Sequence, residues 1–464
     1  MEQLEQLVSA VNRSLSDYVL FFLLAGTGIF FTIRTRFIQV RCFGEGWKEV
    51  FHKFSLHGAK SSGGLSSFQA LSTAVAAQVG TGNIVGAAGA IITGGPGAIF
   101  WMWVIAFFGM ATIYAEAVLA QETRETAPDG TVHGGPVYYI IRAFPNRFGK
   151  FLALFFAVAT ITALGFMGCM VQANSIGESC RDALGVPAWI IGMIIVLLSW
   201  MIFSGGTKRI ARVTEKLVPL MAGIYILGGL IILAIRYRYL PETFHCIFYY
   251  AFAPDALLGG SLGYALKTAV SQGVKRGLFS NEAGMGSTPH AHAVAEVSSP
   301  HKQGCVAMIG VFIDTAVVLT MTALIVISTL YTGDGPLAGT GGESYLAALA
   351  AHDLTKTNLV QHAAASVSTV AIGNIFIAVC LLFFAFSTII SWNFFGKINF
   401  HYLFGKKFIF IYTLLSLFFI FAGTLIKNDL AWELQDMFNQ LMVLPNVLAL
   451  ITLSGAVVRH ARKH

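Results

Sequence analysis

The chain has 464 residues, of which 56% are hydrophobic and 11% are charged, and its mean hydropathy is +0.70. A water-soluble domain of this size could not carry so much apolar surface, and the long, unalternating apolar runs exclude a β-barrel, so we expect an all-α membrane protein. The net charge of +7 does not indicate nucleic-acid binding, because the basic residues gather in short loops, where they set membrane topology.

Ten apolar runs follow one another along the chain, and a helix needs about 20 residues to cross a bilayer. The runs lie near residues 17–33, 66–92, 96–121, 149–178, 186–204, 216–235, 304–331, 369–395, 408–426 and 438–458. Six basic residues between Arg34 and Lys60 place the first loop in the cytoplasm and the N-terminus outside. We expect no cleavable signal peptide, because Glu2 and Glu5 stand where such a peptide is basic.

The topology of the second half requires an eleventh crossing. Without one between Arg236 and Lys302, the basic residues of the second half and of the C-terminal tail would face outward. The segment 258–298 must supply this crossing, although charged residues interrupt it. We therefore expect a broken helix that is buried among others, with Glu282 paired to Lys275 or Arg276.

About eleven spans divide into one extra helix and two sets of five. Residues 1–65 would hold an extracellular N-terminus, the extra helix and a basic cytoplasmic loop. Residues 66–237 would form the first five-helix repeat, and residues 238–464 the second, with a short cytoplasmic tail. The first helix of each set, at 66–92 and 258–298, carries a break. This is the pattern of inverted-repeat transporters, in which discontinuous helices bind the cargo near the midplane of the membrane.

The first break has the sequence QVGTGN, from Gln78 to Asn83. A break there leaves the carbonyls of residues 76–79 at the end of one half-helix and the N–H groups of residues 82–84 free at the start of the next. The carbonyl end attracts cations and the N–H end attracts anions, so a zwitterionic amino acid with Na⁺ fits both. As an alternative, the glycines only allow close helix packing, but packing would not account for the polar side chains.

The second break has the sequence SNEAGMGSTPHAH, from Ser280 to His292. It concentrates polar and helix-breaking residues within a few positions, and Asn281 is the candidate for contact with the cargo. His290 and His292 could suggest a metal site, but no third ligand lies at a useful spacing. We interpret them as loop histidines at the cytoplasmic end.

Polar residues inside other spans are further candidates. Gln172 and Asn174 could reach the cargo or could hydrogen-bond between helices. Asp314 is a candidate cation or proton ligand, with a salt bridge to a basic residue of 258–298 as the alternative.

Ser387 and Thr388 place two hydroxyls together in one span. Hard cations such as Na⁺ take oxygen ligands of this kind beside backbone carbonyls. In the alternative, the hydroxyls bond only to carbonyls of their own helix.

The six cysteines show neither metal-ligand nor CxxC spacing, and we interpret them as small core residues. Cys180 and Cys246 lie near the predicted extracellular ends of spans, so a disulfide between them is possible.

These stretches resemble the alanine or glycine:cation symporter family, also called the sodium:alanine symporters. The family's pattern is visible at residues 66–121, 273–293, 303–315 and 384–392. The resemblance implies Na⁺- or H⁺-coupled uptake of small neutral amino acids, usually alanine or glycine and in some members glutamine or serine. It also implies the leucine-transporter-like fold of the amino acid, polyamine and organocation superfamily, preceded by one extra helix, with no cofactor other than Na⁺ as the coupling ion.

Carried over residue by residue, the resemblance implies two kinds of site. The carbonyls of Ala76 and Val79 would bind a sodium ion that Ser387 and Thr388 complete. The cargo site would be made by Gln78, Thr81, Gly82, Asn83, Gln172, Ser280 and Asn281. A second cation or proton site would lie near Asn83 and Asp314.

The sequence fits two other functions, those of a channel and of a membrane-embedded enzyme, less well than transport. A channel needs symmetric copies of a carbonyl-lined filter, whereas the two breaks are dissimilar. A membrane-embedded enzyme needs a metal motif or a nucleophile with a base, and neither spacing appears. We therefore expect a secondary transporter of the cell membrane, with no obligatory protein partner.

Overall fold

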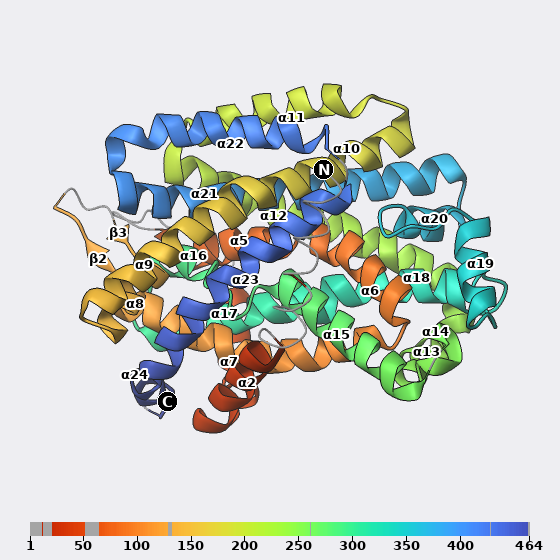
Figure 1. Ribbon diagram of the computed structural model, residues 1–464, viewed down its shortest axis with the longest axis horizontal. Helices are drawn as coiled ribbons and strands as arrows, with labels where there is room; N and C mark the ends of the chain where they lie inside the picture. Colours follow the sequence, from red (N-terminus) through yellow and green to blue (C-terminus); the bar gives the residue numbers. More distant parts are fainter. Residues whose placement is uncertain are drawn as a thin grey trace.

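The computed structural model describes residue 12 and residues 21–51, 65–128, 132–259, 261–426 and 428–462. Some expectations lie outside these residues, namely those on Glu2, Glu5, the start of the first run at 17–20, Lys53, Lys60 and Lys463. In the described part, most residues are helical and each strand has two residues. The long helices run roughly along the long axis of the molecule (Figure 1).

The first half of the chain ends with the long helix α12. Its elements, in chain order, are α2 (Phe21–Arg34), α3 (Ile38–Arg41), α4 (Phe43–Phe51), β1 (Leu65–Ser66), α5 (Ser67–Gln78), η2 (Gly82–Gly86), α6 (Ala87–Gly94), α7 (Ala98–Glu122), β2 (Glu125–Thr126), β3 (Val132–His133), α8 (Pro136–Ala143), α9 (Arg147–Thr160), η3 (Ile161–Gly168), α10 (Cys169–Leu184), α11 (Ala188–Phe203) and α12 (Gly206–Ile235).

The second half begins with a short turn of 3-10 helix. Its elements are η4 (Tyr237–Tyr239), α13 (Leu240–Phe252), α14 (Asp255–Leu258), α15 (Leu262–Asn281), α16 (Pro289–Ala293), β4 (Ala295–Glu296), α17 (Pro300–Val311), η5 (Phe312–Leu319), α18 (Thr320–Val326), η6 (Ile327–Tyr331), α19 (Glu343–Ala351), α20 (Leu359–Ala365), α21 (Val370–Phe404), η7 (Lys406–Phe408), α22 (Ile409–Gly423), α23 (Asn428–Thr452) and α24 (Ser454–Arg462).

The apolar helices make this a multi-pass membrane protein. Within the described residues, 6 helices are long and apolar enough to cross a membrane, or up to 8 if each of two bent pairs is one span. Two shorter apolar helices, Phe22–Arg34 and Ala188–Phe203, account for the remaining predicted runs. The segment proposed as an eleventh crossing forms α15, which is not among these spans, so the total of eleven stays a prediction.

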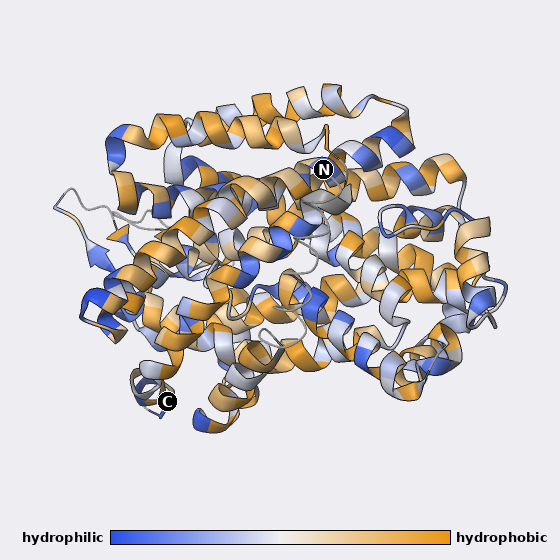
Figure 2. Ribbon diagram, in the orientation of Figure 1, coloured by the Kyte–Doolittle hydropathy of each residue, from blue (hydrophilic) through white to orange (hydrophobic). Residues whose placement is uncertain are grey.

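The structure contains helices that the apolar runs did not predict. Helices α13, α19 and α20 fill the segments that follow spans and lie together at one end of the molecule (Figure 1). A bend of 58° separates α23 from α24, so the last predicted run is not one straight helix. Hydrophobic residues line the long helices, and hydrophilic residues gather toward the two ends of the long axis (Figure 2).

A short ladder joins the two predicted broken helices. Strand β1 directly precedes α5 and pairs in parallel with β4, which follows α16, so that Leu65 lies opposite Ala295. The Ser66 hydroxyl then caps α5 by accepting from the backbone N–H of Gln69, whose side chain accepts from the N–H of Ser66. The start of the first broken helix is therefore fixed against the end of the second.

All six cysteines are buried and none is in a disulfide, as expected for small core residues. A disulfide between Cys180 and Cys246 is therefore wrong for this structure. The physical reason is their placement, since Cys180 packs in one hydrophobic cluster with Ile195 and Cys246 in a different one with Ile247.

Candidate functional site

The first helix break lies between α5 and η2. The chain leaves helical geometry after Gln78, turns at Val79, and resumes at Gly82, so that the two half-helices differ by 46° in direction. A side chain on Gly80 would overlap the Thr388 hydroxyl, so only glycine permits this close approach. The backbone N–H of Gly80 donates to Asn83 Oδ1 at 3.0 Å, which closes the turn.

Carbonyl oxygens at the end of α5 meet two hydroxyls of α21. Thr388 Oγ1 lies 2.9 Å from Ala76 O, 3.5 Å from Ala77 O and 3.4 Å from Val79 O. Ser387 Oγ lies 3.4 Å from Ala76 O, and both hydroxyls also reach Phe384 O of their own helix. The hydroxyls therefore bond to a carbonyl of their own helix and also to carbonyls of α5, and a Na⁺ site at this group of oxygen atoms, which suit a hard cation, stays a prediction.

Asp314 connects the two breaks. Its carboxylate accepts from Asn83 Nδ2 of the first break at 2.6 Å and from Ser280 Oγ of the second at 3.0 Å. Thr315 Oγ1 donates to the other oxygen at 2.8 Å. The predicted alternative of a salt bridge is not what is observed, because these neutral donors surround a carboxylate that is 0% exposed.

Three buried polar atoms of the predicted cargo residues have no hydrogen-bond partner among the described residues: Gln78 Oε1, Thr81 Oγ1 and Asn281 Nδ2. Thr288 Oγ1, at the end of the second break, is also unpartnered. The other groups of these residues are engaged, since Gln78 Nε2 donates to Asn281 O at 2.8 Å and Thr81 N donates to Gln172 Oε1 at 3.2 Å. Leaving a buried polar atom unpaired costs about 1–3 kcal/mol. One acceptor and two potential donors are therefore available to a ligand.

One expected free backbone group is already used. The N–H of Asn83 donates to Gly80 O at 3.2 Å, so the prediction that it would be free is wrong. The reason is the tight turn from Gly80 to Asn83, in which the chain bonds to itself at the start of the π-helical segment η2.

The second break follows α15 and consists of left-handed turns. Glu282 has φ 58°, Gly284 has φ 87° and Gly286 has φ 79°, and α16 begins at Pro289. The N–H groups of Gly284 and Gly286 donate to the two carboxylate oxygens of Glu116 at 3.1 and 2.9 Å. A buried carboxylate therefore holds the backbone of this break.

Glu116 is a site residue that the sequence reasoning missed. It lies in α7, is 0% exposed, and also accepts from Asn446 Nδ2 of α23 at 2.7 Å. The signal was present, because an acidic residue in the apolar run 96–121 is by default a functional candidate.

Glu282 does not pair with Lys275 or Arg276, which corrects the prediction. Its carboxylate accepts from Ser287 Oγ at 2.5 Å and from the Trp392 indole. Both basic side chains instead contact Asp436 Oδ2 of α23 at 3.3 Å. The left-handed backbone of Glu282 ends the helix, so its side chain does not continue the helix face that carries the basic residues.

For Asn174 the structure shows one of the two open alternatives, the hydrogen bond between helices, and for His290 and His292 it corrects the prediction of loop histidines. Asn174 donates to Gly423 O and Ile426 O at 3.0 and 2.9 Å, so it connects α10 to the end of α22 and does not face the breaks. His290 and His292 are buried in α16 and not in an exposed loop, because Asn399 Nδ2 and Gln303 Nε2 contact one nitrogen of each ring at 2.8 Å.

A partly open pocket lies beside the second broken helix. Its lining includes Lys275, Phe279 and Asp436. A Cβ on Gly82 would lie 3.2 Å from the Phe279 ring, so this ring separates the first break from the pocket.

The site as a whole offers buried oxygen ligands and no bound cationic side chain. In the part of the chain that the structure describes, the ion pairs do not include Glu116, Glu282 or Asp314. Buried carboxylates without a protein counter-ion suit a site that takes up cations or protons.

Known proteins match this chain over most of its length. A profile described as the sodium:alanine symporter family matches residues 1–464. Sodium/alanine symporter AgcS of Methanococcus maripaludis is 40% identical over 98% of this chain and 96% of its own length. YrbD of Bacillus subtilis, named as a candidate sodium/proton-dependent alanine carrier protein, is 40% identical over 96% of this chain and 90% of its own length.

Among solved structures, a manganese transporter from Eremococcus coleocola, which has the leucine-transporter-like fold, matches with a TM-score of 0.52. The match covers 84% of this chain and 78% of that chain at 13% sequence identity. At this identity the likeness concerns the fold alone.

Proposed function

Because the chain belongs to the sodium:alanine symporter family, we propose that it carries alanine or glycine into the cell together with Na⁺, by alternating access. The family is one of transporters, so the chain is not an enzyme. The observation that carries the choice of cargo is the set of three unpartnered polar atoms of the predicted cargo residues.

The cargo lies between the breaks, at Gln78, Thr81, Gly82, Asn83, Gln172, Ser280 and Asn281. Gln78 Oε1 accepts from the ammonium group, and Thr81 Oγ1 and Asn281 Nδ2 donate to the carboxylate. A zwitterion therefore supplies what the protein leaves unpaired. The space is narrow, since a Cβ on Gly82 would lie 3.2 Å from Ser280 Cα and from the Phe279 ring, and this favours a small side chain over glutamine.

Na⁺ binds among the carbonyls of Ala76 and Val79 and the hydroxyls of Ser387 and Thr388. All four are oxygen ligands, and Thr388 already reaches both carbonyls. Since the carbonyls belong to α5 and the hydroxyls to α21, the ion ties the first broken helix to a long helix of the other half. Binding of Na⁺ then fixes the half-helix whose end holds the cargo.

Asp314 forms a second site, for a cation or a proton. Its carboxylate contacts both breaks and has neutral donors only. H⁺-coupled transport is the alternative mechanism, and YrbD, whose name includes both ions, gives it a specific basis.

The architecture that goes with this function has one extra helix at residues 1–65 and two inverted five-helix repeats at 66–237 and 238–464. The breaks after α5 and after α15, and the likeness of the fold to that of the manganese transporter, support it. The protein lies in the plasma membrane. Its N-terminus is outside the cell and its C-terminus is in the cytoplasm, as the positions of the basic loops indicate.

The proposal is tested with purified protein in liposomes. Uptake of labelled alanine should saturate with concentration and should require an inward Na⁺ gradient. A parallel series with an inward H⁺ gradient and no Na⁺ separates the two couplings. Flux that rises linearly with alanine and ignores both gradients would contradict symport, and uptake of glutamine in preference to alanine would contradict the assigned cargo.

A further inference from the structure

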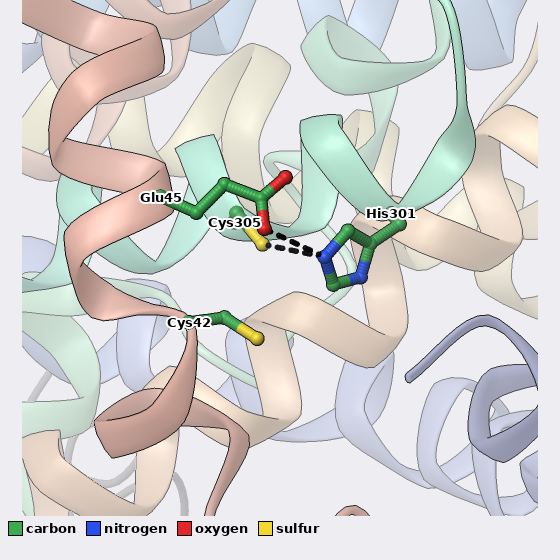
Figure 3. A group of neighbouring side chains, drawn as sticks. All are labelled: Cys42, Glu45, His301 and Cys305. Atoms are coloured by element: carbon green, nitrogen blue, oxygen red, sulfur yellow. Dashed lines mark hydrogen bonds and ion pairs between the residues drawn. The ribbon is translucent and has the colours of Figure 1, made fainter. Parts of the chain in front are cut away.

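Four metal-ligating side chains meet outside the proposed transport site. Cys42 lies directly before α4 and Glu45 in its first turn, and His301 and Cys305 lie on one face of α17 (Figure 3). One ligand atom from each, two sulfurs, an imidazole nitrogen and a carboxylate oxygen, lies within 4.8 Å of all the others. The two cysteines are far apart in sequence, which is why their spacing did not reveal them.

We propose that these four side chains form a binding site for a tetrahedral divalent transition-metal ion of the Zn²⁺ type. Zinc takes sulfur, nitrogen and oxygen ligands at about 2.0–2.3 Å, so neighbouring ligand atoms of a tetrahedron lie about 3.3–3.8 Å apart. His301 Nε2 already lies 3.4 Å from Cys305 Sγ and 3.2 Å from Glu45 Oε2. The mixed thiolate and imidazole set suits Zn²⁺ and excludes Mg²⁺ and Ca²⁺.

The surroundings of the histidine fit this role. Tyr114 OH lies 2.7 Å from His301 Nδ1, which turns the other ring nitrogen, Nε2, toward the cluster. Metal-bound histidines are held in this way by a hydrogen bond to their second nitrogen.

Three of the four residues of the cluster are buried, and the fourth is partly exposed. Cys42, His301 and Cys305 are buried, whereas the Glu45 side chain is 36% exposed and gives an ion a way in. A bound ion clamps α4 to α17, and α17 continues directly into η5, which carries Asp314. The site is separate from the cargo contacts, so its test does not depend on the proposed transport function.

The experiment titrates the reduced, chelator-treated, full-length protein with Co²⁺ and follows the absorbance. One equivalent should bind with the thiolate-to-cobalt charge-transfer band of a tetrahedral site, and Zn²⁺ should displace it. The double substitution Cys42→Ser with Cys305→Ser should abolish the band, whereas Cys380→Ser, which removes a buried cysteine outside the cluster, should leave it unchanged. Tyr114→Phe should weaken binding about 10-fold, because it frees the imidazole.

Two results would overturn the assignment. The first is a wild-type protein that binds no stoichiometric Co²⁺, or binds it without a thiolate band. The second is a Cys42–Cys305 disulfide in protein prepared without reductant, combined with no metal binding after reduction. Both are read on the wild-type protein, so they do not depend on whether a variant folds.

Discussion

The first break, at Gln78 to Asn83, and the second, at Glu282 to Thr288, leave helical geometry by different means. Glycine at position 80 lets the first break approach α21, and its carbonyls face hydroxyls. The second break turns through left-handed residues, and Glu116 already accepts two of its N–H groups. The difference teaches that the backbone carbonyls of the first break are available to an ion, whereas the backbone of the second break is held by Glu116 and offers the cargo a side chain, that of Asn281.

Filling the first break should have the largest effect. Gly82→Leu puts a side chain against the Phe279 ring and the backbone of Ser280, where a Cβ alone already lies at 3.2 Å. We expect alanine binding to weaken by about 100-fold or more, which corresponds to the upper range of overpacking costs. Gly86→Ala is the matched control, because its Cβ would meet only Thr81 O at 3.9 Å. Equilibrium binding of labelled alanine measures both, and normal binding by Gly82→Leu would mean that the cargo lies elsewhere.

Removing the support of the second break should cost stability. Glu116→Ala leaves the N–H groups of Gly284 and Gly286 without their acceptor and removes one of the two acceptors of Asn446 Nδ2. We expect a loss of about 2–4 kcal/mol, seen as a lower melting temperature of the purified protein. Glu125→Ala, at an exposed position of β2, is the control and should change little. An unchanged melting temperature for Glu116→Ala would show that the second break needs no carboxylate.

The two hydroxyls of α21 should differ in their effect on Na⁺. Thr388 contacts three carbonyls of the first break and Ser387 contacts one. Thr388→Ala should therefore raise the Na⁺ concentration for half-maximal uptake by about 10-fold, equivalent to 1.4 kcal/mol, and Ser387→Ala by less.

Thr388→Ser keeps the hydroxyl and should restore the Na⁺ dependence. Ser391→Ala removes another buried hydroxyl of the same helix and should have no effect on it. If Ser391→Ala and Thr388→Ala have the same effect on the Na⁺ dependence of uptake, the Thr388 hydroxyl is not a specific ligand of Na⁺.

The smallest effects should come from α10, where two neighbouring amides have different roles. Gln172→Ala removes the acceptor of Thr81 N and should weaken alanine binding several-fold. Asn174→Ala removes two donors to the end of α22 and should lower stability by about 1–2 kcal/mol with unchanged affinity. Equal losses of affinity in both variants would contradict the assignment of Asn174 to a structural role.

Much of the fold follows from local pattern. The ten apolar runs coincide with helices because lipid requires long helices with satisfied backbones, and the breaks fall where Gly80, Gly82, Gly284 and Gly286 interrupt helix formers. Helices α13, α19 and α20 were missed because they lie between spans, where hydropathy carries no signal.

The contacts of the site were harder to predict, because they depend on which distant helices pack together. The pairing of Asp314 with Asn83 and Ser280 joins three segments, and the sequence indicated only that each was polar. Glu282 was predicted to have a basic partner because Lys275 and Arg276 are near it in sequence. Both basic side chains instead form ion pairs with Asp436 of α23. Closeness in sequence gave the wrong partner because α15 ends at Glu282, and its side chain points away from the two basic residues.

The central claim is that both breaks hold one cargo molecule, with Na⁺ at the end of the first. It is tested most directly by an experimental structure of the protein with Na⁺ and alanine bound. The account predicts alanine between Gln78, Thr81 and Asn281, and an ion among Ala76 O, Val79 O, Ser387 Oγ and Thr388 Oγ1. Alanine bound instead in the pocket beyond Phe279, with the three polar atoms still unpartnered, would contradict it.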